Sequence, residues 1–260
     1  MHAFYFGNSD KPLYGVSHPP TSNNYRNSAI LICNSIGHEY IRSHRALRQL
    51  ANRLADLGYY VMRFDYTGVG DSSGDFNNVS LSDWKNDINL ASEELKAISA
   101  QDRISVIGLR IGATLSLMAS SQCDFNNIIM LDPVTSGKHF TDNLELLQKR
   151  LLVDPDWFAQ ERSMNDMLEN EYLGYKYSSN VIQELNSLFY SKFDIPDYQL
   201  LSTINTSNDE KYSMKKYFQD NTYDYTEEYI EDMGDWEELS YIDTSLTLNH
   251  VSNHICDILK

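Results

Sequence analysis

Over its first 135 residues the chain alternates short apolar segments with longer segments whose apolar residues recur at helical spacing. The run Ser28–Cys33 is continuously apolar, as strands buried on both faces are. A strand, a helix and a further strand in succession form a parallel crossover unit. The pattern therefore predicts an α/β fold with a mostly parallel central sheet and helices on both faces. Strands are predicted at 3–6, 12–17, 28–33, 59–64, 103–108 and 127–131, and helices at 42–57, 80–98 and 112–121.

The alternation stops after residue 140. Residues 140–193 are rich in Leu, Met and Tyr at helical spacing, and we expect them to form a helical lid over the carboxyl ends of the strands. Strands are then predicted at 198–204 and 226–233, and helices at 211–218 and 247–259. We therefore expect residues 1–260 to form one domain with 140–193 as an insertion.

One short segment joins a predicted strand to a predicted helix through two glycines. Gly108-Leu109-Arg110-Ile111-Gly112 follows the apolar run Ile104–Ile107 and precedes the small residues of a helix. In α/β-hydrolases this place holds the Gly-x-Ser-x-Gly nucleophile elbow, whose turn is so sharp that neighbouring side chains would collide. The central residue of such a turn is strained and raised over the sheet. Here the residue at that place is Arg110 and not serine.

Two further motifs stand at the positions that this fold gives them. The segment 33–39, which includes Ser35, Ile36, His38 and Glu39, follows a strand and precedes a helix, where the oxyanion-hole loop lies. The segment 65–74 resembles the Asp-x-x-Gly-x-Gly-x-Ser loop of many esterases and peptidases. With all three motifs in this order, the chain resembles the serine-aminopeptidase-like branch of the α/β-hydrolases.

A narrower resemblance rests on the segments 37–47, 108–113 and 132–137. They are similar to a hydrolase-like family that accompanies exosortase systems and some biosynthetic clusters, in which arginine also stands at the elbow. The similarity covers residues 1–140 well and the remainder in outline. It implies that Arg110 is a family trait, and that the protein acts in a biosynthetic or export pathway. A family named for its fold says nothing of its chemistry.

Ser-His-Asp catalysis needs a nucleophile, a base and an acid that orients the base. Arg110 is a cation that forms no acyl intermediate. The acid position after the seventh strand falls near Asp209. The base is expected in a loop near Gly234-Asp235-Trp236, which has no histidine, whereas His250 and His254 lie later, inside the predicted last helix. The nucleophile and the base are thus both missing from an ordinary triad.

Several other polar residues are candidates for chemistry or binding. Ser35, His38 and Asp132 could form a displaced catalytic set, although serine is common in turns and His38 and Glu39 could equally hydrogen-bond their own loop. Asp132 ends the strand beside the elbow and either pairs with Arg110 or leaves the guanidinium to an anionic ligand. The residues expected to line a ligand site are Arg110, Ile111, Ser35, Ile36, His38 and Glu39.

The net charge of −16 is carried by the second part of the chain. Residues 1–140 hold 12 Lys and Arg against 13 Asp and Glu, whereas residues 141–260 hold 9 against 24. Such acidity disfavours nucleic-acid binding, and it indicates either solubility or a surface for a basic protein partner. Three distant cysteines, no apolar leader and no apolar run of membrane-spanning length lead us to expect a cytoplasmic protein without a bound metal or cofactor.

Three functions are compatible with these features. The first is a hydrolase-fold protein without its serine that binds a small anionic or acyl-type ligand. The second is a hydrolase or acyltransferase that uses the displaced set Ser35, His38 and Asp132. The third is an interaction protein that acts through its acidic second part.

Overall fold

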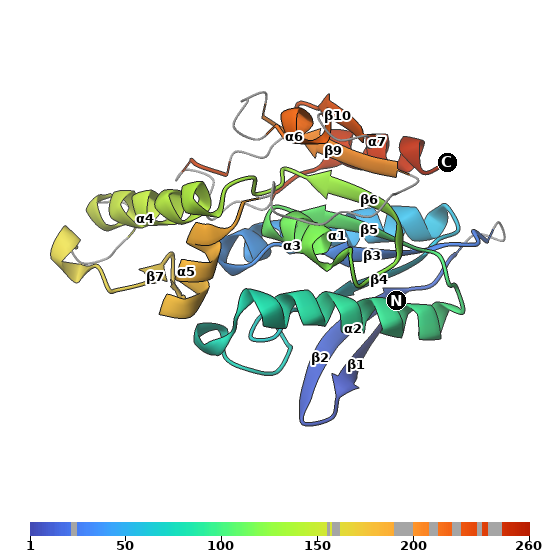
Figure 1. Ribbon diagram of the computed structural model, residues 1–260, viewed down its shortest axis with the longest axis horizontal. Coiled ribbons are helices and arrows are strands. Elements are labelled where there is room, and N and C mark those ends of the chain that lie inside the picture. The colour runs from blue at the N-terminus through green and yellow to red at the C-terminus, as the bar shows by residue number, and fades with distance from the viewer. Residues whose placement is uncertain are drawn as a thin grey trace.

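The chain folds around one eight-stranded sheet, which is mostly parallel (Figure 1). The strand order is β1-β2-β4-β3-β5-β6-β9-β10; β1 is antiparallel to β2 and β2 to β4, and every other neighbouring pair is parallel. This confirms the predicted α/β-hydrolase fold. The computed structural model describes residues 1–21, 25–154, 157, 162–189, 200–207, 213–219, 225–232, 236–238 and 246–260.

The described elements follow the alternation of the sequence. The strands are β1 (His2–Asn8), β2 (Lys11–His18), β3 (Ala29–Cys33), β4 (Tyr60–Phe64), β5 (Ile104–Leu109), β6 (Phe125–Leu131), β9 (Leu200–Asn205) and β10 (Tyr225–Tyr229), and a separate hairpin pairs β7 (Glu171–Tyr172) with β8 (Tyr175–Lys176). The helices are α1 (Gly37–Asp56), α2 (Leu81–Ser99), α3 (Ile111–Ala119), α4 (Gly137–Val153), α5 (Ser179–Ser187), α6 (Lys215–Gln219) and α7 (Asn249–Ile258), with 3-10 turns η1 (Phe76–Asn78) and η2 (Met164–Asp166).

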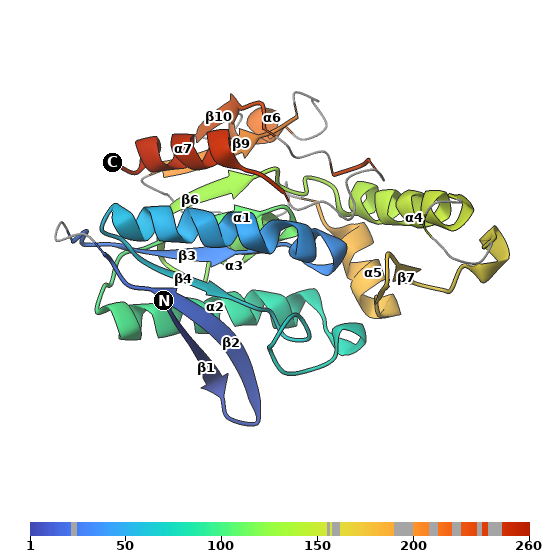
Figure 2. The same cartoon turned by 180° about the vertical axis from the view of Figure 1, so that it is seen from behind.

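The sheet divides the hydrophobic core into two layers. Along β3, Leu31 packs in the layer that holds α2 and α3, whereas Ile30 and Ile32 pack in the layer that holds α1 and α7. Side chains of a strand alternate between its faces, so a continuously apolar strand serves both layers at once. The two pairs of helices lie on opposite sides of the sheet (Figures 1 and 2).

Helix α1 begins five residues earlier than the sequence predicted. Ile36 is extended at the N-cap and Gly37 has φ +59°, so the helix already contains His38 and Glu39. The prediction placed both residues in a loop, and that placement was wrong. The prediction rests on apolar residues at helical spacing. It misses the first turn of α1 because two of the buried residues in that turn, His38 and Glu39, are polar.

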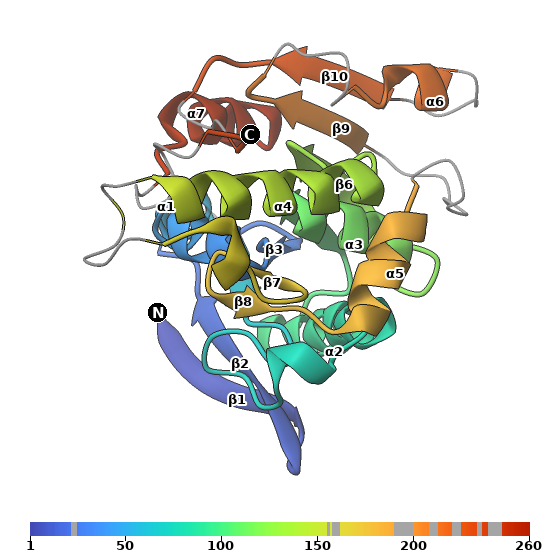
Figure 3. The ribbon, with the colours of Figure 1, turned by 90° about the vertical axis from the view of Figure 1, so that its left-hand side faces the viewer.

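The described residues between β6 and β9 lie beyond the carboxyl ends of the parallel strands (Figure 3). It contains α4 and α5, but also the hairpin β7–β8, which the prediction of helices alone did not include. Leu173 and Gly174 form the two-residue turn of this hairpin, with φ of +53° and +83°. Positive φ at both turn positions suits the twist of a tight hairpin.

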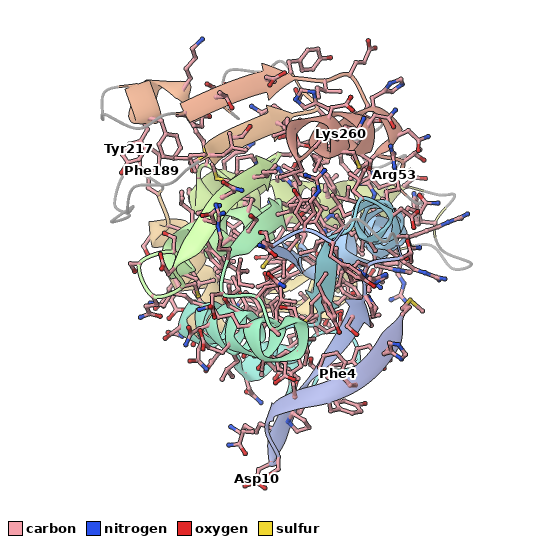
Figure 4. The ribbon with its side chains drawn as sticks, turned by 90° about the vertical axis from the view of Figure 1, so that its right-hand side faces the viewer. Phe4, Asp10, Arg53, Phe189, Tyr217 and Lys260 are labelled. Atoms are coloured by element: carbon pink, nitrogen blue, oxygen red, sulfur yellow. The ribbon has the colours of Figure 1, made fainter. Side chains whose placement is uncertain are left out.

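The two ends of the sheet differ in their surroundings. Phe4 and Asp10 mark the β1–β2 hairpin, which projects away from the rest of the molecule (Figure 4). Arg53 of α1 and Lys260, which follows α7, lie far from this hairpin in the same view. Over the described parts of the chain, no helix is both long and apolar enough to cross a membrane.

Candidate functional site

The segment around Arg110 has the backbone of a nucleophile elbow. Arg110 lies between β5 and α3 with φ +54° and ψ −122°, a conformation that is costly for a residue with a side chain. A methyl group on Gly108 would overlap the backbone of Ala113, and one on Gly112 would overlap the carbonyl oxygen of Asn34. Only glycine fits at these two positions, because other parts of the backbone pass so close to them. The segment therefore has the turn of a nucleophile elbow, with Arg110 at its centre.

The guanidinium of Arg110 is held by three groups of the protein. Its Nε donates to Glu39 Oε1 at 3.1 Å, and its Nη1 donates to the main-chain oxygen of Asp132 at 3.1 Å. Its Cζ lies 5.0 Å from the ring centroid of Trp236, within the range of a cation–π contact. Arg110 is only 4% exposed. Its charge is thus compensated inside the protein.

Glu39 is the counter-ion of Arg110. It lies in the first turn of α1 and is 1% exposed. Its second oxygen accepts a hydrogen bond of 2.5 Å from Ser35 Oγ. A carboxylate near a helix N-terminus is also favoured by the helix dipole. The arginine, the serine and the helix end together compensate a charge that would otherwise be very costly to bury.

Asp132 does not use its carboxylate to pair with Arg110. One oxygen accepts from the backbone N–H of Thr206, and the other accepts from Thr206 Oγ1, both at 2.6 Å, and from Trp236 Nε1 at 2.9 Å. Burial raises the pKa of Asp132 above its usual value, while these hydrogen bonds oppose that rise. The sequence offered two alternatives, pairing with Asp132 or a free guanidinium. Neither describes the structure, because Glu39 is the partner.

The contacts at the site have the order found in a triad. Asp132 contacts Trp236 and Trp236 contacts Arg110, as the acid contacts the base and the base contacts the nucleophile. Asp132, which follows β6, accepts a hydrogen bond from the indole N–H of Trp236, and the indole ring lies against the side chain of Arg110. Arg42 of α1 lies near the same ring, with Cζ 5.3 Å from its centroid. The indole N–H only donates, whereas the imidazole of a triad both accepts and donates a proton.

His38 is buried and lies next to Glu39. Neither ring nitrogen has a hydrogen-bond partner among the described residues. Burial lowers its pKa to about 4, with Arg42 and Arg110 contributing in the same direction and Glu39 opposing them. The ring is therefore neutral near pH 7 and offers one donor and one acceptor.

The other predicted site residues are distributed as follows. Ile36, which precedes α1, and Ile111, the first residue of α3, are fully buried. His254 of α7 pairs with Glu228 of β10, at 3.2 Å from Nε2 to Oε1. Asp209, and with it the predicted acid position, lies outside the described residues.

Trp236 and Tyr177 are site residues that the sequence analysis did not identify. In the sequence, Trp236 marks only the loop that lacks the base histidine, and Tyr177 is one of several tyrosines in the segment 140–193. Tyr177 is buried, with its hydroxyl against Gly37. It also lines a cavity of about 520 Å³ between η1 and the hairpin, to which Asn77, Asn170 and Lys176 contribute.

The fold and the elbow define an α/β-hydrolase-fold protein. Residues 29–177 match the family model described as serine aminopeptidase, S33, and the chain belongs to this family. No curated protein sequence matches the chain significantly.

Solved structures with the same fold cover nearly the whole chain. Est1E from Butyrivibrio proteoclasticus, in complex with ferulic acid, has 16% identity and a TM-score of 0.68 over 99% of this chain and 98% of that one. Mouse alpha/beta hydrolase domain-containing protein 10 has 16% identity and a TM-score of 0.60 over 100% and 98%. XC6422 from Xanthomonas campestris, described as an α/β serine hydrolase without a lid, has 15% identity and a TM-score of 0.58 over 89% and 84%. At these identities the similarity concerns the fold alone.

Proposed function

We propose that this member of the family does not carry out serine-dependent hydrolysis and instead binds a small acyl-type ligand above the carboxyl ends of its strands. The observation that carries the proposal is Arg110 at the tip of the elbow, ion-paired with Glu39 and packed against Trp236. Arg110 stands in the place of the nucleophile and Trp236 in the place of the base, and neither side chain supplies the function of the residue it replaces.

The geometry favours a neutral acyl compound over an anion. From the sequence, an anionic ligand is expected only if the Arg110 guanidinium is free to bind it. In the structure a buried carboxylate already compensates that cation, so an anion would have to compete with Glu39. We also propose that residues 140–193 act as a lid, and that the biosynthetic or export pathway implied by the narrower resemblance is the setting of this binding.

A hydrolase with a displaced nucleophile is the competing proposal, and one contact favours it. Ser35 Oγ donates to Glu39 at 2.5 Å, the arrangement that a general base needs. Two observations weigh against it. Ser35 is fully buried, and the carboxylate of Glu39 is already ion-paired with Arg110. Within the described parts of the chain, His38 makes no hydrogen bond with Ser35, and the carboxylate of Asp132 bonds to Thr206 and Trp236 instead.

A fluorophosphonate probe followed by intact-mass measurement tests the proposal. We expect no adduct with the wild-type protein, and native mass spectrometry of freshly purified protein is expected to show a co-purified acyl compound. Stoichiometric labelling that is lost in Ser35→Ala would overturn the proposal in favour of the displaced nucleophile. Ser72→Ala, in the loop between β4 and η1, is the matched serine control.

The acidic second part of the chain could add a protein-binding function. Among its described residues, Glu237 Oε1 lies 3.0 Å from His139 Nε2, and Glu228 Oε1 lies 3.2 Å from His254 Nε2. A pull-down with a basic partner whose binding disappears when exposed acids at 225–232 are neutralised would support this second role.

A further inference from the structure

A second group of cationic and aromatic side chains lies on β2 and β4, on the side of the sheet that α1 covers (Figure 2). Val16 lies opposite Arg63 and His18 lies opposite Val61, so these four side chains share one face of the sheet. Val61 packs in the same core layer as the apolar residues of α1. The face that carries Arg63 and His18 is therefore the face toward α1.

The guanidinium of Arg63 is oriented by a neutral histidine. Arg63 Nε donates to His18 Nε2 at 3.3 Å, and His18 Nδ1 lies 2.8 Å from Asn52 Oδ1. Because arginine only donates, His18 Nε2 is the acceptor, and the ring proton lies on Nδ1 and is donated to Asn52. Burial lowers the pKa of His18 to about 4, so the ring stays neutral near pH 7. The chain from Asn52 through His18 thus fixes the direction of Arg63 without compensating its charge.

Arg63 is partly buried and has no counter-ion at pairing distance within the described parts of the chain. Asp65, two residues further along, accepts hydrogen bonds from the Tyr40 hydroxyl at 2.8 Å and from the backbone N–H of Asp71 at 3.0 Å. Burial lowers the pKa of Arg63, and the more distant charge of Asp65 opposes this only in part. Because desolvation of a cation is costly, an anion at the Nη groups of Arg63 would be favourable.

Arg48 brings a second guanidinium to the same place. Since β3 and β4 are parallel, α1 runs against the direction of β4. Arg48 is one helical turn before Asn52, which contacts His18, a shift of about 6 Å toward the carboxyl ends of the strands. Arg63 is two residues after Val61, the residue opposite His18, a shift of about 6.7 Å in the same direction. The side chains of Arg48 and Arg63 therefore lie beside each other.

The charges around Arg48 agree with this placement. Burial is the main cause of the lowered pKa of both His18 and Arg63, and the charge of Arg48 contributes to each. Arg48 is exposed and forms no ion pair with any described residue. Helix α1 holds four arginines and no acid between Glu39 and Asp56, although the whole chain has a net charge of −16.

We propose that Arg48 and Arg63 bind a phosphate monoester, and that the group which carries the phosphate packs on Tyr14. Tyr14 is two residues before Val16 on β2, which makes it a diagonal neighbour of Arg63 on the same face. Its ring packs edge-on against the exposed ring of Tyr5, with centroids 5.5 Å apart. This site is separate from the elbow and does not depend on the proposed function.

Two guanidiniums select the class of anion. A carboxylate has two oxygens, and a single guanidinium already satisfies both. A phosphate monoester offers three free oxygens and a charge of about −1.5 to −2 at pH 7, so it can bridge Arg48 and Arg63. A nucleic acid would place many phosphates against a strongly acidic chain, which favours a small ligand.

The test titrates the full-length protein by NMR with phenyl phosphate and, separately, with benzoate. Phenyl phosphate should bind saturably and at least about tenfold more tightly than benzoate, because only it can engage both guanidiniums. Arg48→Gln and Arg63→Gln should each weaken its binding by at least about fivefold. Arg45→Gln is the matched control: it removes the same charge from an exposed position of the same helix, and the affinity should stay within about twofold of the wild type.

Further variants test how the site is built. His18→Gln retains an acceptor for Arg63 Nε and should bind like the wild type, whereas His18→Leu should bind more weakly. Inorganic phosphate, which has no ring, should bind more weakly than phenyl phosphate to the wild type and equally to Tyr14→Ala. Equal binding of the two phosphates to the wild type would contradict the contact with Tyr14.

Three results would overturn the inference. The first is an affinity of both Arg48→Gln and Arg63→Gln for phenyl phosphate within about twofold of the wild type. The second is equal binding of benzoate and phenyl phosphate. The third is an equal loss in Arg45→Gln and Arg48→Gln, which would mean a general attraction to α1. If Arg63→Gln does not fold, Arg63→Lys replaces it: lysine keeps the charge without the planar fork and should still weaken binding.

Discussion

Arg110 and Glu39 form a buried ion pair, 3.1 Å from Nε to Oε1, between the elbow after β5 and the first turn of α1. The two residues are 71 positions apart in the chain. Their contact lies where a hydrolase of this fold has its nucleophile and its oxyanion loop. The pair links two motifs that the sequence shows separately, and the first prediction concerns its energy.

Glu39→Gln should lower the free energy of unfolding by about 3–5 kcal/mol, because it leaves a buried guanidinium without its counter-charge. Replacing both partners, as Glu39→Leu with Arg110→Met, should recover most of that loss. Urea denaturation measures all three variants. Glu93→Gln is the control: it breaks the exposed pair with Lys96, where the change should stay within about 1 kcal/mol. Equal effects of the buried and the exposed substitution would contradict the assigned pairing.

The triad-like order predicts what would restore hydrolysis. Arg110→Ser alone would leave the buried Glu39 carboxylate without a counter-charge, so serine is introduced together with Glu39→Gln. This double variant should remain at background with p-nitrophenyl acetate, since Trp236 occupies the place of the base. Adding Trp236→His should raise the rate by about 10²-fold or more, as a positioned general base does.

Asp132→Asn in that triple variant is the decisive control. If Asp132 serves as the acid, the restored rate should fall again by at least about tenfold, because the imidazole loses the carboxylate that orients it. High activity in the double variant without Trp236→His would mean that a working base is already present, and the interpretation of Trp236 would then be wrong.

His38 should make the protein less stable in acid. Its pKa is lowered by burial from 6.5 to about 4 in the folded state, so between these pH values the unfolded chain binds more protons. The contribution of neutral His38 is therefore present above about pH 6.5 and is lost as the pH falls to about 4, with a magnitude of about 3 kcal/mol. Urea unfolding at pH 7 and pH 4 should show this loss in the wild type and a smaller one in His38→Gln. The same pH dependence in both proteins would contradict the buried neutral ring.

Gly37→Ala should reveal the contact with Tyr177. In the wild type the added methyl group meets both a positive φ of +59° and the tyrosine hydroxyl, 2.5 Å away. In a Tyr177→Phe background the oxygen is absent, and only the backbone strain of about 1–2 kcal/mol remains. The difference between the two costs, measured by thermal unfolding, should exceed about 1 kcal/mol. If Gly37→Ala costs the same free energy in both backgrounds, the Tyr177 hydroxyl does not contact Gly37.

The sequence determined the sheet, its covering helices and the elbow. Continuous apolar runs such as Ser28–Cys33 and glycines flanking Arg110 act locally, through burial on both faces and through the steric demands of one turn. The absence of serine at the elbow is also a property of the sequence alone. The beginning of α1 was predicted less well, because its first turn is buried with polar side chains.

Only the tertiary structure decided which carboxylate meets Arg110. The sequence indicates only Asp132 as a partner, whereas in the structure Thr206 and Trp236 bind the carboxylate of Asp132 and Glu39 pairs with Arg110. Residues as distant as 39, 110, 132 and 236 come together only when parallel strands place their carboxyl ends at one edge of the sheet. Pairing there depends on directions of side chains and on burial, and neither is encoded in spacing or composition.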